Sequence, residues 1–261
     1  MRPRKAEVLL ATLYIGSTLL SITSIISLVT AWQHWTWTLD TCISVDCGCI
    51  LYGINAFRTF VGGDVRLCQF GSYALIPGIL IALCLGGYHG YRCCINKNLD
   101  NPRRMTREEY SNDRNNLNGQ IVMVRMKRRA VFKHWMPIAF LTALISCLSL
   151  AHMVVITDGY YRTCDQYRRN LVEVLGSRGR EIQVIHNRLA CGAIFDFMDY
   201  LHPDTNNWVR GSEINTGIAL QLAITTSWFN FFAWLCACTI NFIMARKRLH
   251  NLGEKFCCCC C

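Results

Sequence analysis

Charged side chains are missing from four long apolar stretches of this sequence. Residues 8–32, 69–91, 135–157 and 217–244 contain no Asp, Glu, Lys or Arg. Each stretch is longer than the ~20 residues that an α-helix needs to cross the hydrocarbon core of a bilayer. Charges inside a bilayer are costly and usually mark ion pathways, so their absence disfavours ion-coupled transport. The sequence therefore predicts an all-α membrane protein with four transmembrane helices.

Motifs for catalysis and glycosylation are also missing. No Asn-X-Ser/Thr acceptor occurs, and no nucleophile lies in a recognisable constellation with a base. Cys47 and Cys49 are separated by one residue, unlike the Cys-x-x-Cys pair of redox enzymes. No nucleic-acid-binding motif accompanies the net charge of +10. We therefore expect no enzyme activity, catalytic residue, cofactor, metal site or nucleic-acid partner.

Basic residues are divided unevenly among the segments that connect the apolar stretches. Residues 1–7, 92–134 and 245–261 together carry 18 basic and 6 acidic side chains, whereas 33–68 and 158–216 carry 9 and 11. Short segments rich in Lys and Arg remain in the cytosol. Both termini and the 92–134 loop are thus expected to be cytosolic. The first stretch exceeds the roughly 7–15 apolar residues of a signal peptide, so we expect it to remain as a signal anchor.

These two patterns predict nine consecutive segments. They are a cytosolic tip at 1–7, a first span at 8–32, an outer loop at 33–68, a second span at 69–91, a basic cytosolic loop at 92–134, a third span at 135–157, an outer loop at 158–216, a fourth span at 217–244, and a basic polycysteine cytosolic tail at 245–261. The two outer loops are expected to face the exterior or a lumen.

Six of the 17 cysteines lie in the outer loops. They are Cys42, Cys47, Cys49, Cys68, Cys164 and Cys191. An even number of cysteines in an oxidising compartment favours disulfide bonds. Six cysteines allow fifteen pairings, so composition leaves the connectivity open. Loops of about 35 and 60 residues have little core of their own, and one bridge across such a loop contributes roughly 3–4 kcal/mol.

Seven further cysteines lie beside the predicted spans on the cytosolic side. They are Cys93, Cys94, Cys257, Cys258, Cys259, Cys260 and Cys261. Thiols next to a membrane and preceded by basic residues are candidates for S-palmitoylation. The basic residues would add attraction to anionic headgroups at the cytosolic face. Two alternatives stay open for the tail: prenylation, although the two middle positions of the last four are not aliphatic, and binding of a soft metal ion.

Polar and small residues inside the spans suggest contacts between helices. Gly86 and Gly90 form a small-xxx-small pair, which lets helices approach closely. Three serines of the first span and three amides of the fourth are expected to face neighbouring helices: Ser17, Ser21, Ser24, Gln221, Asn230 and Asn241. We interpret these residues as packing contacts, and a transport path is the less favoured hypothesis.

Aromatic residues cluster just beyond two of the spans. Trp32, Trp35 and Trp37 follow the first span, and Tyr160 and Tyr161 follow the third. Tryptophan and tyrosine at such positions are typical of the belt at the headgroup level. A second aromatic patch, at 194–201, is expected to cover the disulfide-bonded loop against the membrane, and binding of a partner is the less favoured alternative.

The order of several motifs along the chain resembles that in the transmembrane protein 179 family. They are Cys49-Ile-Leu-Tyr-Gly53, Leu67-Cys68-Gln-Phe70, Thr163-Cys164, Cys191, the patch at 195–201, Ala219-Leu-Gln221, and Ser227-Trp228 through Trp234. The resemblance implies a four-span protein whose four outer cysteines are Cys49, Cys68, Cys164 and Cys191. Cys42 and Cys47 then form an additional pair, for which a local bridge is favoured. The long basic loop and the polycysteine end depart from the family, whose biochemical activity is not established.

The sequence thus favours a non-enzymatic function in a plasma membrane or endomembrane. We expect a multi-pass protein that organises or modulates unidentified membrane protein partners through its outer loops. The alternative is a pore or transporter, formed by a homo-oligomer and lined by Asn and Gln side chains.

Overall fold

The computed structural model describes residues 3–40, 42, 46–56, 59–94, 132–174, 189–201 and 214–258. Four of its helical segments are long and apolar enough to cross a membrane: Lys5–Leu39, Val65–Cys94, Trp135–Glu173 and Thr216–Arg246. Each of these segments contains the greater part of one predicted apolar stretch. The prediction of four helical spans is therefore confirmed in length and composition, whereas the protein is mostly helical rather than all-α, because residues 49–63 also contain a two-stranded sheet.

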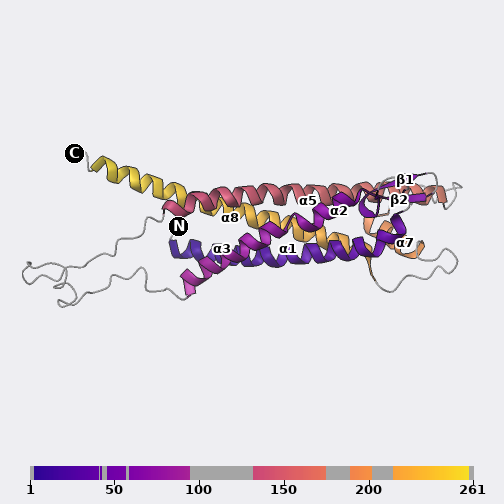
Figure 1. Cartoon of the computed structure of the whole chain (residues 1–261), viewed down its shortest axis with the longest axis horizontal. Coiled ribbons are helices and arrows are strands. Elements are labelled where there is room, and N and C mark those ends of the chain that lie inside the picture. Colours follow the sequence, from indigo (N-terminus) through magenta and orange to yellow (C-terminus); the bar gives the residue numbers. More distant parts are fainter. Residues whose placement is uncertain are drawn as a thin grey trace, which may run out of the picture.

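The elements form an elongated helical bundle with a small folded unit at one end. In chain order they are α1 (Pro3–Leu39), β1 (Cys49–Ala56), β2 (Thr59–Gly63), α2 (Val65–Tyr73), α3 (Ile76–Cys94), α5 (Phe132–Val174), α7 (Cys191–Leu201) and α8 (Thr216–Cys258). Figure 1 shows β1, β2 and α7 at one end, and the beginning of α1 and the end of α8 at the other. We call the first end, with α2 and the adjoining parts of α1, α5 and α8, the head, and the other the tail end.

Three of the helices are much longer than the predicted spans. Helix α1 has 37 residues, and α5 and α8 have 43 residues each. At 1.5 Å per residue they measure roughly 55–65 Å, about twice the thickness of a hydrocarbon core. Helix α5 continues without a break through residues 158–174, which were predicted to lie in a loop. Ion pairs one turn apart support this extension, because Asp158 pairs with Arg162 and Asp165 with Arg169 at 3.0 and 2.9 Å.

The second span is interrupted, which the sequence analysis did not predict. Helix α2 ends at Tyr73, and α3 begins at Ile76 after a turn at residues 74–75. Pro77 explains the break, because proline has no N–H to donate to the carbonyl of Tyr73 and disfavours helical geometry at the residue before it. On either side of the turn the helical bonds resume, with Ile79 N–H donating to Leu75 at 3.0 Å.

Small and polar side chains join α1 to α8 along the middle of the bundle. Ser17 Oγ donates to Asn230 Oδ1 at 2.6 Å, and Ser24 Oγ donates to the Ala223 carbonyl at 3.1 Å. Nearer the tail end, Asn241 Nδ2 donates to the Tyr14 hydroxyl at 2.9 Å. The predicted inward orientation of these serines and asparagines is therefore confirmed.

Of the two remaining predicted helix contacts, one is present and one is not. The side chain of Gln221 is exposed, but its amide donates to the Tyr160 hydroxyl of α5 at 3.3 Å. Gly86 packs closely on Tyr14, but a Cβ placed at Gly90 would meet nothing within 4 Å. One turn of α3 separates these glycines, and of the two only Gly86 faces side chains of α1.

The head has a hydrophobic core, which the outer loops were not expected to build. Nineteen buried residues from every element of the head form it. The largest fully buried members are Trp35, Tyr167, Phe195, Leu28, Leu39, Ile50, Leu51, Ile156 and Leu171. Trp35 and Tyr160 are 1% and 4% exposed, so their assignment to the headgroup belt is wrong. Trp37 is 91% exposed and retains that assignment.

Candidate functional site

The head is built around a two-stranded antiparallel hairpin with a bulge. Ile54 pairs with Val61, and the register shifts between Cys49 and Ile54. Within this shift Tyr52 has φ of 59°, a left-handed conformation that non-glycine residues seldom adopt. A side chain at Gly63 would overlap the carbonyls of Leu51 and Tyr52, so glycine is required where the strands approach.

The bulge is held against α5 by one threonine. The Gly53 N–H donates to Thr163 Oγ1 at 3.1 Å, and the same hydroxyl donates to the Ile50 carbonyl at 2.9 Å. These bonds satisfy two backbone groups that the register shift removes from the strand ladder. Gly159, one turn earlier on α5, leaves room for the Tyr52 ring. The Cys-Ile-Leu-Tyr-Gly motif and Thr163 are therefore two halves of one joint.

The six outer cysteines form three disulfide bonds. Cys42 bonds to Cys47, Cys49 to Cys68, and Cys164 to Cys191, with sequence separations of 5, 19 and 27 residues. The first is the local bridge that the sequence analysis favoured. The second joins β1 to α2, and the third joins α5 to α7. Each of the two longer bridges ties an element of the head to a helical segment that is long and apolar enough to cross a membrane.

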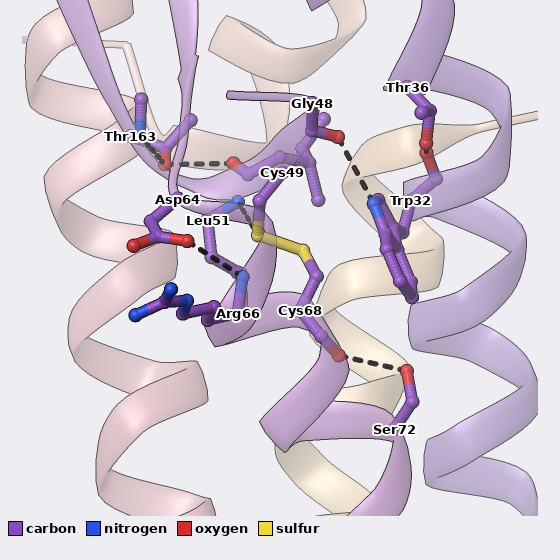
Figure 2. The surroundings of a disulfide bond; sticks show 12 residues. Trp32, Thr36, Gly48, Cys49, Leu51, Asp64, Arg66, Cys68, Ser72 and Thr163 are labelled. Atoms are coloured by element: carbon purple, nitrogen blue, oxygen red, sulfur yellow. Dashed lines mark hydrogen bonds between the residues drawn. A yellow bond between two sulfur atoms is a disulfide. The ribbon is translucent and has the colours of Figure 1, made fainter. Parts of the chain in front are cut away.

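Hydrogen bonds fix the surroundings of the Cys49–Cys68 disulfide (Figure 2). The Trp32 indole N–H donates to the Gly48 carbonyl at 3.1 Å and links α1 to the hairpin. Asp64 caps α2, since its carboxylate accepts the Arg66 N–H at 2.9 Å. The sulfur–sulfur bond lies between these two contacts, so α1, β1 and α2 meet at one point.

A buried acidic residue connects α7 to the start of α8. Asp199 is 2% exposed and accepts two bonds from Thr216, from the backbone N–H at 3.0 Å and from the hydroxyl at 2.6 Å. The Trp35 indole N–H donates to the same threonine hydroxyl at 2.7 Å. A carboxylate at the beginning of a helix is stabilised by the helix dipole and by unpaired N–H groups. Sequence reasoning missed Asp199, because no motif distinguishes it from the other acidic residues of its loop.

Helix α7 has one buried and one exposed aromatic face. Ile194, Phe195 and Met198 are fully buried in the head core. Phe197 and Tyr200 lie on the other face and are 40% and 41% exposed. The predicted role of this patch in covering the head is correct for the first face only. The second face is left as an aromatic surface.

An open groove lies on the other side of the head, between β1 and α5. It has a volume of about 520 Å³ and is lined by residues 52–54 and by Tyr161, Arg162, Asp165 and Gln166. The Arg162 guanidinium lies over the Tyr52 ring, 5.6 Å from its centroid. Burial and the nearby Asp158 carboxylate raise the pKa of the Tyr52 hydroxyl to about 12, and Arg162 opposes this rise. Tyr52 is therefore neutral at physiological pH.

Four of the seven predicted lipidation residues are described, and they lie at the tail end. Cys93 is half-buried and Cys94 exposed at the last two positions of α3, where Arg92 forms an ion pair with Glu7 at 3.0 Å. Cys257 and Cys258 are the last residues of α8, whereas Cys259, Cys260 and Cys261 lie outside the described residues. Across the described parts of the chain, no group of three or more His, Cys, Asp or Glu side chains is arranged to hold a metal ion.

Comparisons with protein-family models, with curated proteins and with solved structures gave no match.

Proposed function

We propose that this protein is a non-enzymatic organiser of membrane proteins, and that its head binds a partner through the exposed face of α7. The observation that carries the proposal is the pair of exposed aromatic rings, Phe197 and Tyr200, on a helix whose other face is fully buried. Aromatic side chains are enriched at the centres of protein interfaces, where they supply large contact areas. Because the helix is already folded, binding would require little ordering of the backbone.

The connections of α7 support this proposal. The Cys164–Cys191 disulfide fixes its first residue to α5, and Asp199 fixes its last full turn to α8. An aromatic surface attached at both ends keeps its orientation relative to the bundle. Preorganisation of this kind raises affinity by lowering the entropy that is lost on association.

Several further assignments belong to the same proposal. The head would face the exterior or a lumen, and both termini and the 92–134 loop the cytosol, as the basic residues predict. Acylation of Cys93, Cys94 and residues 257–261 would attach the tail end to the cytosolic leaflet of a plasma membrane or endomembrane. Membership of the transmembrane protein 179 family remains part of the proposal.

The contacts inside the bundle favour an organiser over a pore. Asn230 and Asn241, two amides that would line a pore, bond instead to Ser17 and Tyr14 of the same chain. A polar group that already has a partner gains less from contact with water or ions. Reconstituted protein is therefore expected to conduct no ions or solutes, and robust flux would support the pore instead.

Photo-crosslinking tests the proposed surface. A benzophenone amino acid would replace Phe197 or Tyr200 in intact cells, with Phe229, which is 60% exposed on α8, as the lipid-facing control position. Discrete adducts of higher mass are expected at the two α7 positions and not at position 229. The absence of adducts at both α7 positions would contradict the proposal.

Two pairs of cysteine variants make the test sharper. Replacing Cys164 and Cys191 with serine frees the beginning of α7 and should strongly reduce the adducts. Replacing Cys42 and Cys47 removes one disulfide as well, but that bond closes only a short local loop, so the adducts should persist. Equal loss in both pairs would indicate a general effect of disulfide removal.

A further inference from the structure

The groove between β1 and α5 lies at the level of lipid headgroups. The apolar stretch of α5 ends at residue 157, and Tyr161, Arg162 and Asp165 lie on the next two turns. At 1.5 Å per residue, Asp165 is about 12 Å beyond the end of the apolar stretch. The headgroup layer extends roughly 5–8 Å on each side of the hydrocarbon core. Tyr161 and Arg162, about 6 and 8 Å beyond the same point, therefore lie within the headgroup layer, and Asp165 lies a few ångströms outside it.

The groove also opens toward lipid rather than toward the interior of the bundle. Leu150, Val154 and Tyr161 are 41%, 50% and 60% exposed on α5. Their spacing of four and seven residues places them on one face of the helix. Tyr161 thus continues, at the headgroup level, the surface that Leu150 and Val154 present to acyl chains.

The chemistry of the groove combines one guanidinium, one carboxylate and aromatic rings. Arg162 is 67% exposed despite its ion pair with Asp158, and Asp165 is 45% exposed despite its ion pair with Arg169. Guanidinium groups bind phosphate with charge-assisted hydrogen bonds. Quaternary ammonium groups bind to aromatic faces and are attracted by carboxylates. The groove thus carries one partner for each charge of a zwitterion.

We propose that this groove binds the phosphocholine headgroup of a phospholipid in the leaflet at the head end. The phosphate contacts Arg162, and the trimethylammonium group lies between the Tyr161 ring and the Asp165 carboxylate. The negative phosphate and the positive trimethylammonium group match the positive Arg162 and the negative Asp165. An anionic headgroup has no positive group that could pair with Asp165. The joint between Gly53 and Thr163 holds the Tyr52 side of the groove in place before a lipid arrives.

The site is independent of the aromatic surface on α7. Figure 1 shows β1 and α7 on opposite sides of the head. A substitution in the groove should therefore leave the α7 photo-crosslinks unchanged. Failure of either proposal can be recognised without reference to the other.

Lipid photo-crosslinking in nanodiscs tests the headgroup proposal. Purified full-length protein would be placed in nanodiscs of equal amounts of phosphatidylcholine and phosphatidylglycerol. In one experiment a trace of photoactivatable phosphatidylcholine is added, and in a second a trace of photoactivatable phosphatidylglycerol. Peptide mapping should find the phosphatidylcholine label concentrated at residues 52–54 and 161–166. Arg162→Gln should reduce this label by about tenfold, the factor that a charge-assisted hydrogen bond typically contributes.

Matched variants separate the groove from general effects. Arg66→Gln removes a guanidinium elsewhere in the head, and Trp37→Leu an exposed aromatic ring, so both should keep the label. Asp165→Asn should shift the preference toward phosphatidylglycerol. The proposal would be overturned if both lipids labelled the groove equally and Arg162→Gln left that labelling unchanged. A protein segment cross-linked to the groove in cellular samples would also overturn the proposal. As a folding control, each variant should retain all three disulfides.

Discussion

Replacing Asp199 with alanine tests whether the head is attached to the bundle through the start of α8. The substitution removes both acceptors of Thr216, at 3.0 and 2.6 Å, while the Trp35 indole remains bonded to the threonine hydroxyl. A hydrogen bond to a charged group contributes roughly 1.5–3 kcal/mol, and removing the cap of a helix costs about 1 kcal/mol. The bond from the Thr216 N–H is counted in both estimates, so they do not add in full. We expect the free energy of local unfolding of this joint to fall by about 3 kcal/mol.

Hydrogen exchange measures that local unfolding directly. A loss of about 3 kcal/mol corresponds to roughly a hundredfold faster exchange, since each 1.4 kcal/mol is a factor of ten. The change should be confined to peptides that cover α7 and residues 214–222, in nanodiscs and at one pH. Asp199→Asn keeps one oxygen acceptor and should give an intermediate rate.

Asp196 provides the matched control for this experiment. It lies one turn earlier on α7, is half-buried, and accepts a hydrogen bond from the Asn215 side chain at 3.2 Å instead of from the Thr216 backbone. Asp196→Ala should therefore accelerate exchange much less than Asp199→Ala. If Asp199→Ala exchanged at the wild-type rate, the role of this carboxylate would be refuted. Equal acceleration in both variants would show that α7 depends on acidic residues in general.

Three further predictions concern the bundle and its tail end. Gly159→Ala should lower the melting temperature, because the new Cβ would lie 2.8–3.0 Å from Tyr52 and Leu51 and overpacking costs about 1–3 kcal/mol. Gly90→Ala places a Cβ where nothing lies within 4 Å, so it should instead stabilise α3 by up to ~1 kcal/mol. Melting temperatures that shifted in the same direction in both variants would refute this distinction. Asn230→Leu should cost about 0.6–1.7 kcal/mol in an unfolding titration by removing the partner of Ser17, and an unchanged midpoint would show that this bond contributes nothing. Serine at all of 257–261 should abolish most acyl-exchange labelling, and unchanged labelling would exclude the tail as the acylated segment.

The spans could be predicted from the sequence, but the ends of the helices could not. Charge is excluded from a bilayer at high cost, so an uncharged stretch of 23 residues or more is a strong signal. Beyond the bilayer, helix continuation depends on local pairs such as Asp158 with Arg162, which hydropathy does not detect. Residues 158–174 were consequently assigned to an outer loop, although they continue the helix of the third span.

The head illustrates why composition identifies residues better than their roles. Trp35 and Trp37 lie two positions apart beyond the same span, and either could occupy the headgroup belt. Trp35 is buried because the Thr216 hydroxyl accepts its indole N–H, a contact between residues 181 positions apart. The two longer disulfides have the same origin, since they follow from the packing of the hairpin on α2 and of α7 on α5. Spacing along the chain carries no signal for contacts of this range.

The unbroken course of α5 has a mechanical consequence. A straight rod of about 65 Å that tilts by roughly 10° about its midpoint displaces each end by about 5–6 Å. One end of this rod holds the Thr163 joint and the Cys164–Cys191 bridge, and the other adjoins the basic segment that precedes Phe132. Docking that tilted the rod at one aqueous boundary would therefore shift its other end by several ångströms.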